Sequence, residues 1–291
     1  GVQTCALPIF GASVVATRFI ANDIDPLILA FLRYLIASLC LAPALVPVRA
    51  SFCRADLVRI APLGVIFFGL FPWFFSAGLQ YIPASRGALW LATMPALTFA
   101  IAFALRMETA SQHKIIGLLC ASVGAAVAIG PGGAGARTAD AWMGDLLLLL
   151  TAACGAIYFV FSRPVLTRVP ALVMTALSMM AGALFLGVVA LASNRVAAPA
   201  LSFAGWLAVL FLGTFGAAIG FSLWIWALKY STPTRTAVFL ALNPVAATLL
   251  GALVLGEHPP TAFYIAFVLV VLGIVFVNAR PDAPARLEEK A

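Results

Sequence analysis

The chain contains uncharged segments long enough to cross a lipid bilayer, and these segments follow one another almost without interruption. A transmembrane helix needs about 20 consecutive, mostly apolar residues. Such runs occupy residues 60–85, 87–105, 115–136, 169–194, 196–228, 236–256 and 259–279. Segment 26–48 is interrupted only by Arg33, segment 142–162 carries Asp145 in its first turn, and segment 5–21 reads as a truncated first helix. The pattern predicts an all-α integral membrane protein with ten transmembrane helices.

Composition supports a membrane protein and gives no sign of an enzyme. Hydrophobic residues make up 64% of the chain and charged residues 9%, whereas soluble domains are about half apolar and a quarter charged. Long continuous runs are unlike the alternating segments of a membrane β-barrel. The five cysteines are scattered, and no common catalytic, nucleotide-binding or metal-binding motif is present. The sequence therefore predicts no cofactor, no metal site and no enzymatic activity.

The basic residues predict how the chain is oriented. Loops on the cytoplasmic side of a membrane carry an excess of Lys and Arg. With both termini cytoplasmic, twelve basic residues fall inside: Arg49, Arg54, Arg59, Arg106, Lys114, Arg163, Arg168, Lys229, Arg235, Arg280, Arg286 and Lys290. Three fall outside: Arg86, Arg137 and Arg195. The net charge of +7 is thus explained by topology and anionic lipid, and nucleic acid is not an expected partner.

The two halves of the chain repeat one another at an offset of 149 residues. Without a gap in the register, Tyr81, Arg86, Pro95, Glu108 and Gly124 recur as Tyr230, Arg235, Pro244, Glu257 and Gly273. Because five predicted spans, an odd number, separate each residue from its partner, the two copies should cross the membrane in opposite directions. We expect a first five-helix repeat in residues 1–136, a second in 141–280, and a cytoplasmic tail in 281–291.

Charged positions agree with this inversion. Arg106 and Lys114, expected inside, correspond to the apolar residues Leu255 and Phe263, expected outside. Arg86 and Arg235 are an exception that the inversion does not explain. Similar apolar composition of two unrelated helices is the alternative interpretation. A true repeat is favoured because Tyr, Arg, Pro and Glu match in one register.

Three stretches resemble a known family. The segments LAFLRYLIASLCLAP (29–43), PALTFAIAFALRME (95–108) and NPVAATLLGALVLGE (243–257) are similar to the EamA family of the drug/metabolite transporter superfamily. The resemblance extends from about Gly11 to Asn278. It implies ten helices in two halves and export of amino acids or other small metabolites across a bacterial inner membrane. One departure is Phe10-Gly11, where the family often has Trp-Gly.

The repeat interface is where a transporter substrate is expected to bind. Pro95 and Pro244 lie at equivalent positions in the middle of predicted spans, where each would kink its helix. Candidate cavity residues are Trp90, Thr93, Asn243, Tyr158, Trp73 and Trp224. Aromatic residues with few polar groups would suit an amphipathic metabolite. The alternative is that the prolines and aromatic residues serve only helix packing or interfacial anchoring.

Charged residues within or beside the spans have two interpretations each. Arg18 and Arg33 lie inside apolar segments; they could extend to the outer surface towards Asp23 or Asp25, or one could hold a substrate carboxylate. Glu108 and Glu257 end equivalent spans, where capping of a helix or loop pairing is favoured over transport.

These features favour a secondary transporter that exports small organic metabolites by alternating access. A nucleotide-sugar or phosphate-ester carrier is the alternative, although it would need more basic residues facing the cavity. A membrane-embedded enzyme or a channel would require clustered ionisable residues, which the spans lack. The expected partners are a small-molecule substrate and the lipid bilayer, and a homodimer is one arrangement open to the protein.

Overall fold

The computed structural model describes residues 23–45, 54–78, 80–82, 93–129, 140–193, 201–239 and 261–278, together with Trp90, Leu91, Pro199 and scattered residues between 9 and 20. All its elements in these ranges are helical. In chain order they are α2 (Pro26–Leu41), η1 (Ala42–Leu45), α3 (Arg54–Gly64), η2 (Val65–Leu70), α4 (Phe71–Gly78), α6 (Met94–Ala104), α7 (Gln112–Ile129), α8 (Ala141–Val165), α9 (Ala171–Ala192), α10 (Phe203–Phe211), η4 (Leu212–Ile219), α11 (Gly220–Lys229), α12 (Pro233–Val238) and α14 (Thr261–Asn278).

Five continuous helices in this part of the chain are long and apolar enough to span a membrane. They are Pro26–Leu45, Ala55–Gly78, Ala141–Val165, Ala171–Ala192 and Phe203–Lys229. Met94–Ala104 and Tyr264–Asn278 are shorter apolar helices. The protein is therefore an all-helical membrane protein with several apolar spans, and the total of ten stays a prediction.

Local sequence explains where several of these helices begin and end. Asp25 caps α2 by accepting a hydrogen bond from the Leu27 amide at 2.8 Å, and Pro26 occupies the first turn. At the end of α6, Arg106 adopts a φ of 56°, and the Met107 amide donates to the Ala102 carbonyl at 2.8 Å. This bond closes the C-terminus of α6 in the manner of a Schellman motif.

Equivalent elements of the two halves occupy equivalent residues. Helices α7 and α14 have bounds that differ by 149 at both ends. The same shift places α2 within α9, and it moves the beginning of α3, Arg54, onto the beginning of α10, Phe203. Most distinctively, η2 and η4 are both π-helices, and the shift superimposes Leu70, the end of η2, on Ile219, the end of η4. The repeat in the sequence is therefore matched by a repeat of helices.

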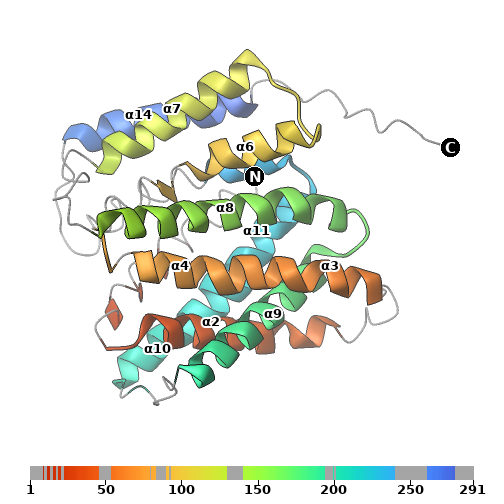
Figure 1. Cartoon of the computed structure of the whole chain (residues 1–291), viewed down its shortest axis with the longest axis vertical. Coiled ribbons are helices and arrows are strands. Elements are labelled where there is room, and N and C mark those ends of the chain that lie inside the picture. Colours follow the sequence, from red (N-terminus) through yellow and green to blue (C-terminus); the bar gives the residue numbers. More distant parts are fainter. Residues whose placement is uncertain are drawn as a thin grey trace.

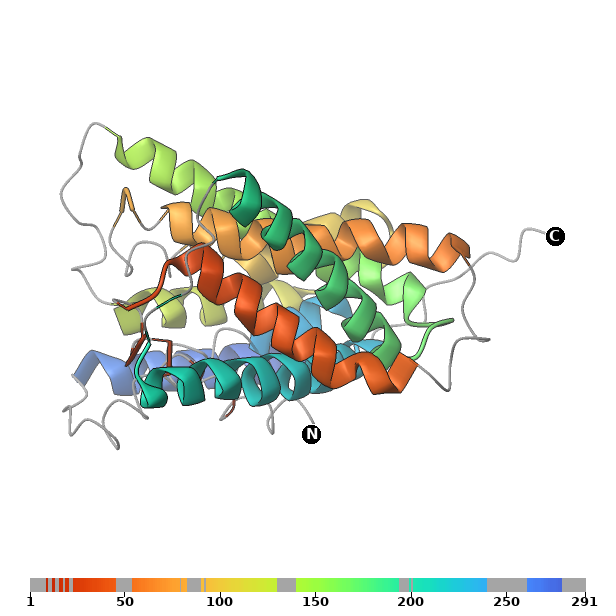
Figure 2. The same ribbon diagram turned by 90° about the horizontal axis from the view of Figure 1, so that it is seen from below.

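Equivalent helices run in opposite directions. In Figure 1, α2 begins at the left and α9 at the right, α3 leads leftward into α4, and α10 leads rightward into α11. Figure 2 shows α2 and α9 side by side, as their close packing requires. Contacts give the same result for α7 and α14, because Gly117 meets Gly273 and Val277 whereas Gly124 meets Leu269 and Val270. The order of contacts along these two helices is antiparallel.

The two halves interlock through reciprocal contacts. Helix α2 packs against η4, and its equivalent α9 packs against η2. Small residues permit the close approach: a methyl group built on Gly182 would lie 2.5 Å from Phe68 Cβ, and one built on Gly117 would lie 2.7 Å from the Gly273 carbonyl oxygen. Membrane helices commonly associate through such small residues, which bring the backbones together.

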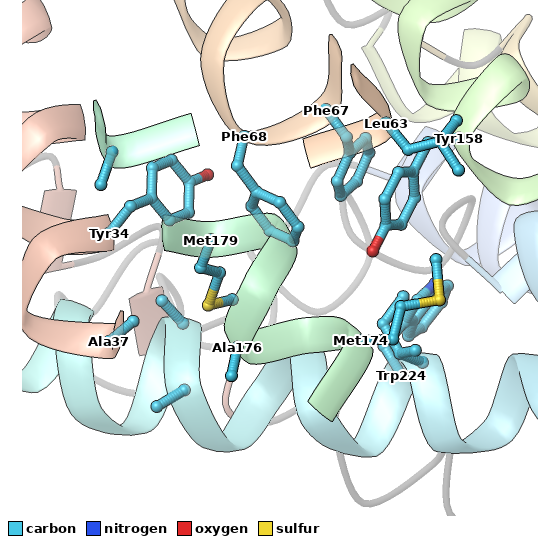
Figure 3. Close-up of a cluster of buried hydrophobic side chains, with 14 of the residues drawn as sticks. Tyr34, Ala37, Leu63, Phe67, Phe68, Tyr158, Met174, Ala176, Met179 and Trp224 are labelled. Carbon is cyan, nitrogen blue, oxygen red and sulfur yellow. The ribbon is translucent and has the colours of Figure 1, made fainter. Parts of the chain in front are cut away.

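The centre of the bundle is an aromatic cluster. Phe67 and Phe68 of η2 meet Tyr158 of α8, and Trp224 of α11 lies close by (Figure 3). Tyr158 and Phe68 are fully buried, and Trp224 is nearly so. The core therefore draws its largest side chains from both halves of the chain.

Candidate functional site

Two of the expected cavity residues, Tyr158 and Trp224, lie in this packed cluster. The Tyr158 ring stacks on Phe67 with centroids 4.5 Å apart and an interplanar angle of 12°. Phe68 meets Tyr158 edge-on at 5.7 Å, and Phe159 lies 6.3 Å from Trp224. Geometries of this kind are favourable between aromatic side chains in a core. In this conformation Tyr158 and Trp224 pack against protein side chains and line neither of the two described pockets.

Beside the aromatic rings lies a group of buried hydroxyls. Tyr158 and Ser162 are four residues apart and thus share a face of α8. The Tyr158 hydroxyl lies near the hydroxyls of Ser162 and Ser178, the latter from α9. All three residues are fully buried, yet none of their hydroxyls meets the geometry of a hydrogen bond with a described residue. Because buried polar groups normally have partners, these neighbouring hydroxyls are placed to pair with one another or with a polar group from a ligand.

The π-helix η2 carries two successive aromatic residues of this centre, Phe67 and Phe68. A π turn contains an extra residue relative to an α turn, so it changes the direction of the side chains that follow. Phe67 and Phe68 are both buried there. Such π turns occur frequently at functional sites. The sequence interpretation contained no signal for η2 or η4, since their hydrogen bonding depends on packing.

Trp73 lies elsewhere, at a pocket of about 190 Å³ between one end of α2, α4 and one end of α9. Trp73 is 39% exposed, and the polar lining comes from Asp25, Ser76, Gln80 and Ser193. Pro72, which also lines the pocket, follows Phe67 by five residues. At 1.5 Å per residue the pocket is thus about 7 Å along the span from the aromatic cluster. The pocket lies at the ends of these helices that are expected to face outward.

Trp90, Thr93 and Pro95 form a separate local structure. The Trp90 indole nitrogen donates to Asp145 Oδ1 at 2.8 Å, and the Thr93 hydroxyl donates to the Trp90 carbonyl at 2.6 Å. Thr93 lies in a turn and Pro95 in the first turn of α6. The helix is interrupted before Pro95 and is not kinked around it. Proline costs little stability in a first helical turn, because the backbone amide that it lacks would have no partner within the helix. Trp90 therefore contacts Asp145, a pairing that the sequence did not indicate.

Arg33 lies halfway along α2 and faces η4. A methyl group built on Gly216 would lie 3.5 Å from Arg33 Nη2. No ion pair joins Arg33 to Asp23 or Asp25. The Arg33 side chain therefore does not reach towards Asp23 or Asp25, which was one of its two sequence-based interpretations. Arg18, Asn243 and Pro244 lie outside the described residues.

A buried ionic junction connects the two halves at the end of the bundle opposite to the Trp73 pocket. Lys114 Nζ donates to Glu108 Oε2 at 2.9 Å, with side chains 3% and 1% exposed, respectively. Glu108 Oε1 accepts the backbone amide of Thr234, in the first turn of α12, at 3.0 Å. Arg163 Nε donates nearby to the Ser231 carbonyl at 2.7 Å. Glu108 therefore does stabilise a helix N-terminus, but in the other half of the chain.

Comparisons with known proteins agree with this architecture. The model of the EamA-like transporter family matches residues 4–130 and 142–279. A probable terminal-alkyne amino-acid exporter of Streptantibioticus cattleyicolor is 28% identical over 255 residues, covering 87% of this chain and 84% of the relative. The uncharacterized inner membrane transporter YedA of Escherichia coli is 25% identical over 285 residues, covering 93% and 87%.

A solved crystal structure of a protein has the same fold, with a TM-score of 0.80 and 22% identity over 98% of this chain and 97% of that one. The family match occurs once in each half, as expected for a chain built from two similar units. The resemblance found in the sequence is therefore confirmed, as is the expectation that the protein is not an enzyme. The chain belongs to the EamA-like transporter family and is a multi-pass membrane transporter.

Proposed function

We propose that this transporter exports small amphipathic organic metabolites, amino acids foremost, by alternating access between two inverted five-helix halves. Residues 1–136 and 141–280 form the halves, and both termini face the cytoplasm of a bacterial cell. The observation that carries the proposal is that equivalent helices run in opposite directions while both π-helices face the opposite half. Inverted repeats of this kind rock around a shared central site in many secondary transporters.

The central cluster suits an amphipathic substrate. Phe67, Phe68 and Trp224 offer apolar and aromatic surface, and the hydroxyls of Tyr158 and Ser178 offer polar contacts. In the conformation described, the rings pack on each other, so substrate binding requires η2 and α8 to separate. The pocket at Trp73 supports a route from the outward side, since it ends about 7 Å from Phe67 along the same span.

A relative's substrate supports amino acids as the first class to test. The Streptantibioticus relative is named a probable terminal-alkyne amino-acid exporter, and such an amino acid combines a zwitterionic head with an apolar alkyne. The alternative, a nucleotide-sugar or phosphate-ester carrier, would need several cations at membrane depth. Among the described spans, Arg33 alone supplies one in the middle of a helix.

Transport in proteoliposomes tests the proposal. The purified chain should exchange labelled leucine or propargylglycine across the membrane faster than empty liposomes do. Tyr158→Phe and Ser178→Ala should each slow exchange severalfold without loss of folded protein. Ser38→Ala is the matched control, because the Ser38 hydroxyl is buried but already bonded to the Tyr34 carbonyl at 2.7 Å. Absence of exchange for every amino acid offered would refute the substrate class, and equal rates in all three variants would refute the site.

A further inference from the structure

Arg33 is a cation at the depth of the protein core. It is the eighth of 16 residues in α2, about 10 Å from Pro26 at the helix start. The repeat gives an independent measure of its depth, because its equivalent in α9 is Gly182, which packs against Phe68. Phe68 is fully buried, and its own equivalent in η4 is Ala217, next to Gly216. Arg33 therefore lies at the α2–η4 contact, and the equivalent contact in the repeat is the one between α9 and η2, where Phe68 lies.

The charge of Arg33 has no protein partner among the described residues. Its Nε atom is buried without a hydrogen bond. Its guanidinium carbon lies 5.8 Å from the ring centroid of the adjacent Tyr34. The carboxylate of Asp25 is bonded to the start of α2, and Asp23 is exposed. An ionised group at membrane depth is costly unless an opposite charge or water accompanies it, and such residues mark substrate pathways.

The surroundings of Arg33 suit a small anion. The π-helix η4 presents Gly216 to the guanidinium, so no side chain from this position covers it, and the Ser13 hydroxyl oxygen lies beside the same glycine. A planar guanidinium binds a carboxylate through two parallel hydrogen bonds. Tyr34, the next residue, meets Phe68 edge-on at 5.1 Å, which connects the cation to the aromatic cluster.

We infer that Arg33 binds the carboxylate of the transported molecule at the α2–η4 contact, and that the transporter therefore favours substrates with a free carboxylate. That the bound molecule is also the transported one rests on the proposed function, but binding of a carboxylate to Arg33 can be measured without transport. The apolar part of the molecule then lies towards Phe68 and Tyr158. The phosphate of an anionic lipid could bind the same guanidinium, because it is also an oxyanion, and adding phosphatidylglycerol distinguishes the two ligands.

Thermal unfolding of the purified full chain in neutral detergent tests the inference directly. The probes are sodium 3-phenylpropionate and its neutral amide, 3-phenylpropanamide, at constant ionic strength. A ligand that binds the folded state raises the unfolding temperature. The wild type is expected to bind the carboxylate about tenfold or more tightly than the amide, since hydrogen bonds to charged groups are strong. Arg33→Gln and Arg33→Met should abolish this preference, and Arg33→Lys, which lacks the planar fork, should reduce it.

Arg59→Gln is the matched control, because Arg59 is an exposed arginine of α3 and its loss should leave the preference unchanged. Equal binding of acid and amide by the wild type would overturn the inference, whether or not the variants fold. A preference that survives in Arg33→Gln or Arg33→Met would overturn it as well. If added phosphatidylglycerol stabilises the wild type through Arg33 and the carboxylate does not, Arg33 is a lipid site and the inference fails. Amino-acid exchange in proteoliposomes, measured separately, decides the proposed function.

Discussion

Replacing Glu108 with alanine should destabilise the protein strongly, because it would remove the carboxylate that neutralises the buried Lys114 ammonium. The two charges are 2.9 Å apart and almost completely shielded from solvent. At an effective dielectric constant of about 20 their attraction is about 6 kcal/mol. Mutational data for buried ion pairs place the cost of removing one partner at about 3–5 kcal/mol, since the remaining ion can reorganise. Loss of the bond from the Thr234 amide adds to this cost.

We therefore expect Glu108→Ala to lower the free energy of unfolding by about 3–5 kcal/mol. Reversible unfolding in mixed micelles of mild detergent and sodium dodecyl sulfate, followed by tryptophan fluorescence, would measure this. The double variant Glu108→Ala/Lys114→Met removes the buried positive charge together with its counter-ion and should recover most of the loss, leaving about 1 kcal/mol for the missing helix cap. Asp23→Ala, at an exposed acid, is the control and should have little effect.

Two results would refute this reasoning. If the single variant is as stable as the wild type, the junction contributes nothing to holding the halves together. If the double variant is no more stable than the single one, the loss does not come from removing the counter-charge of Lys114.

Three further predictions concern packing, a hydrogen bond and topology. Gly117→Val should destabilise the protein by about 1–3 kcal/mol in the same unfolding assay, because its side chain would enter the α14 backbone; an unchanged midpoint would show that the two helices can separate freely. Trp90→Phe should cost about 1.5–3 kcal/mol by removing the hydrogen bond to Asp145, and Asp145→Asn in the Trp90→Phe background should add less than it does alone. Single cysteines at Thr109 and His258, in a chain otherwise free of cysteine, should react with membrane-impermeant reagents from opposite sides; reaction from one side would contradict the inverted repeat.

Repeated residues in the sequence predicted much of the helix arrangement. The offset of 149 residues relates the observed bounds of α7 and α14. It could be read in advance because Tyr, Arg, Pro and Glu residues of the two halves match in one register, while the spans themselves follow from apolar runs, since a helix in lipid satisfies its backbone internally. The placement of Glu108 at a helix N-terminus was likewise expected from its position at the end of a span, although the helix it serves, α12, was not.

Other parts of the site could not be predicted. Whether a helix adopts a π turn depends on neighbouring side chains, so η2 and η4 left no signal in the sequence. Trp90 and Asp145 are 55 residues apart, and their hydrogen bond exists only because the packing of α6 against α8 brings the segments together. The positions of the aromatic candidates were likewise not predictable: among the described residues, Tyr158 and Trp224 are core residues, whereas Trp73 borders a pocket.

The sequence by itself determined the solvent in which this protein folds and the symmetry of its two halves, because bilayer-length apolar runs and a fixed residue offset are properties of the chain alone. The tertiary structure decided which polar groups are paired and which are not. Ser162 and Ser38 are both buried serines of apolar helices, yet the Ser38 hydroxyl is bonded to a carbonyl and the Ser162 hydroxyl is not. That difference depends on side-chain positions set by the packing of several helices at once, which no local pattern encodes.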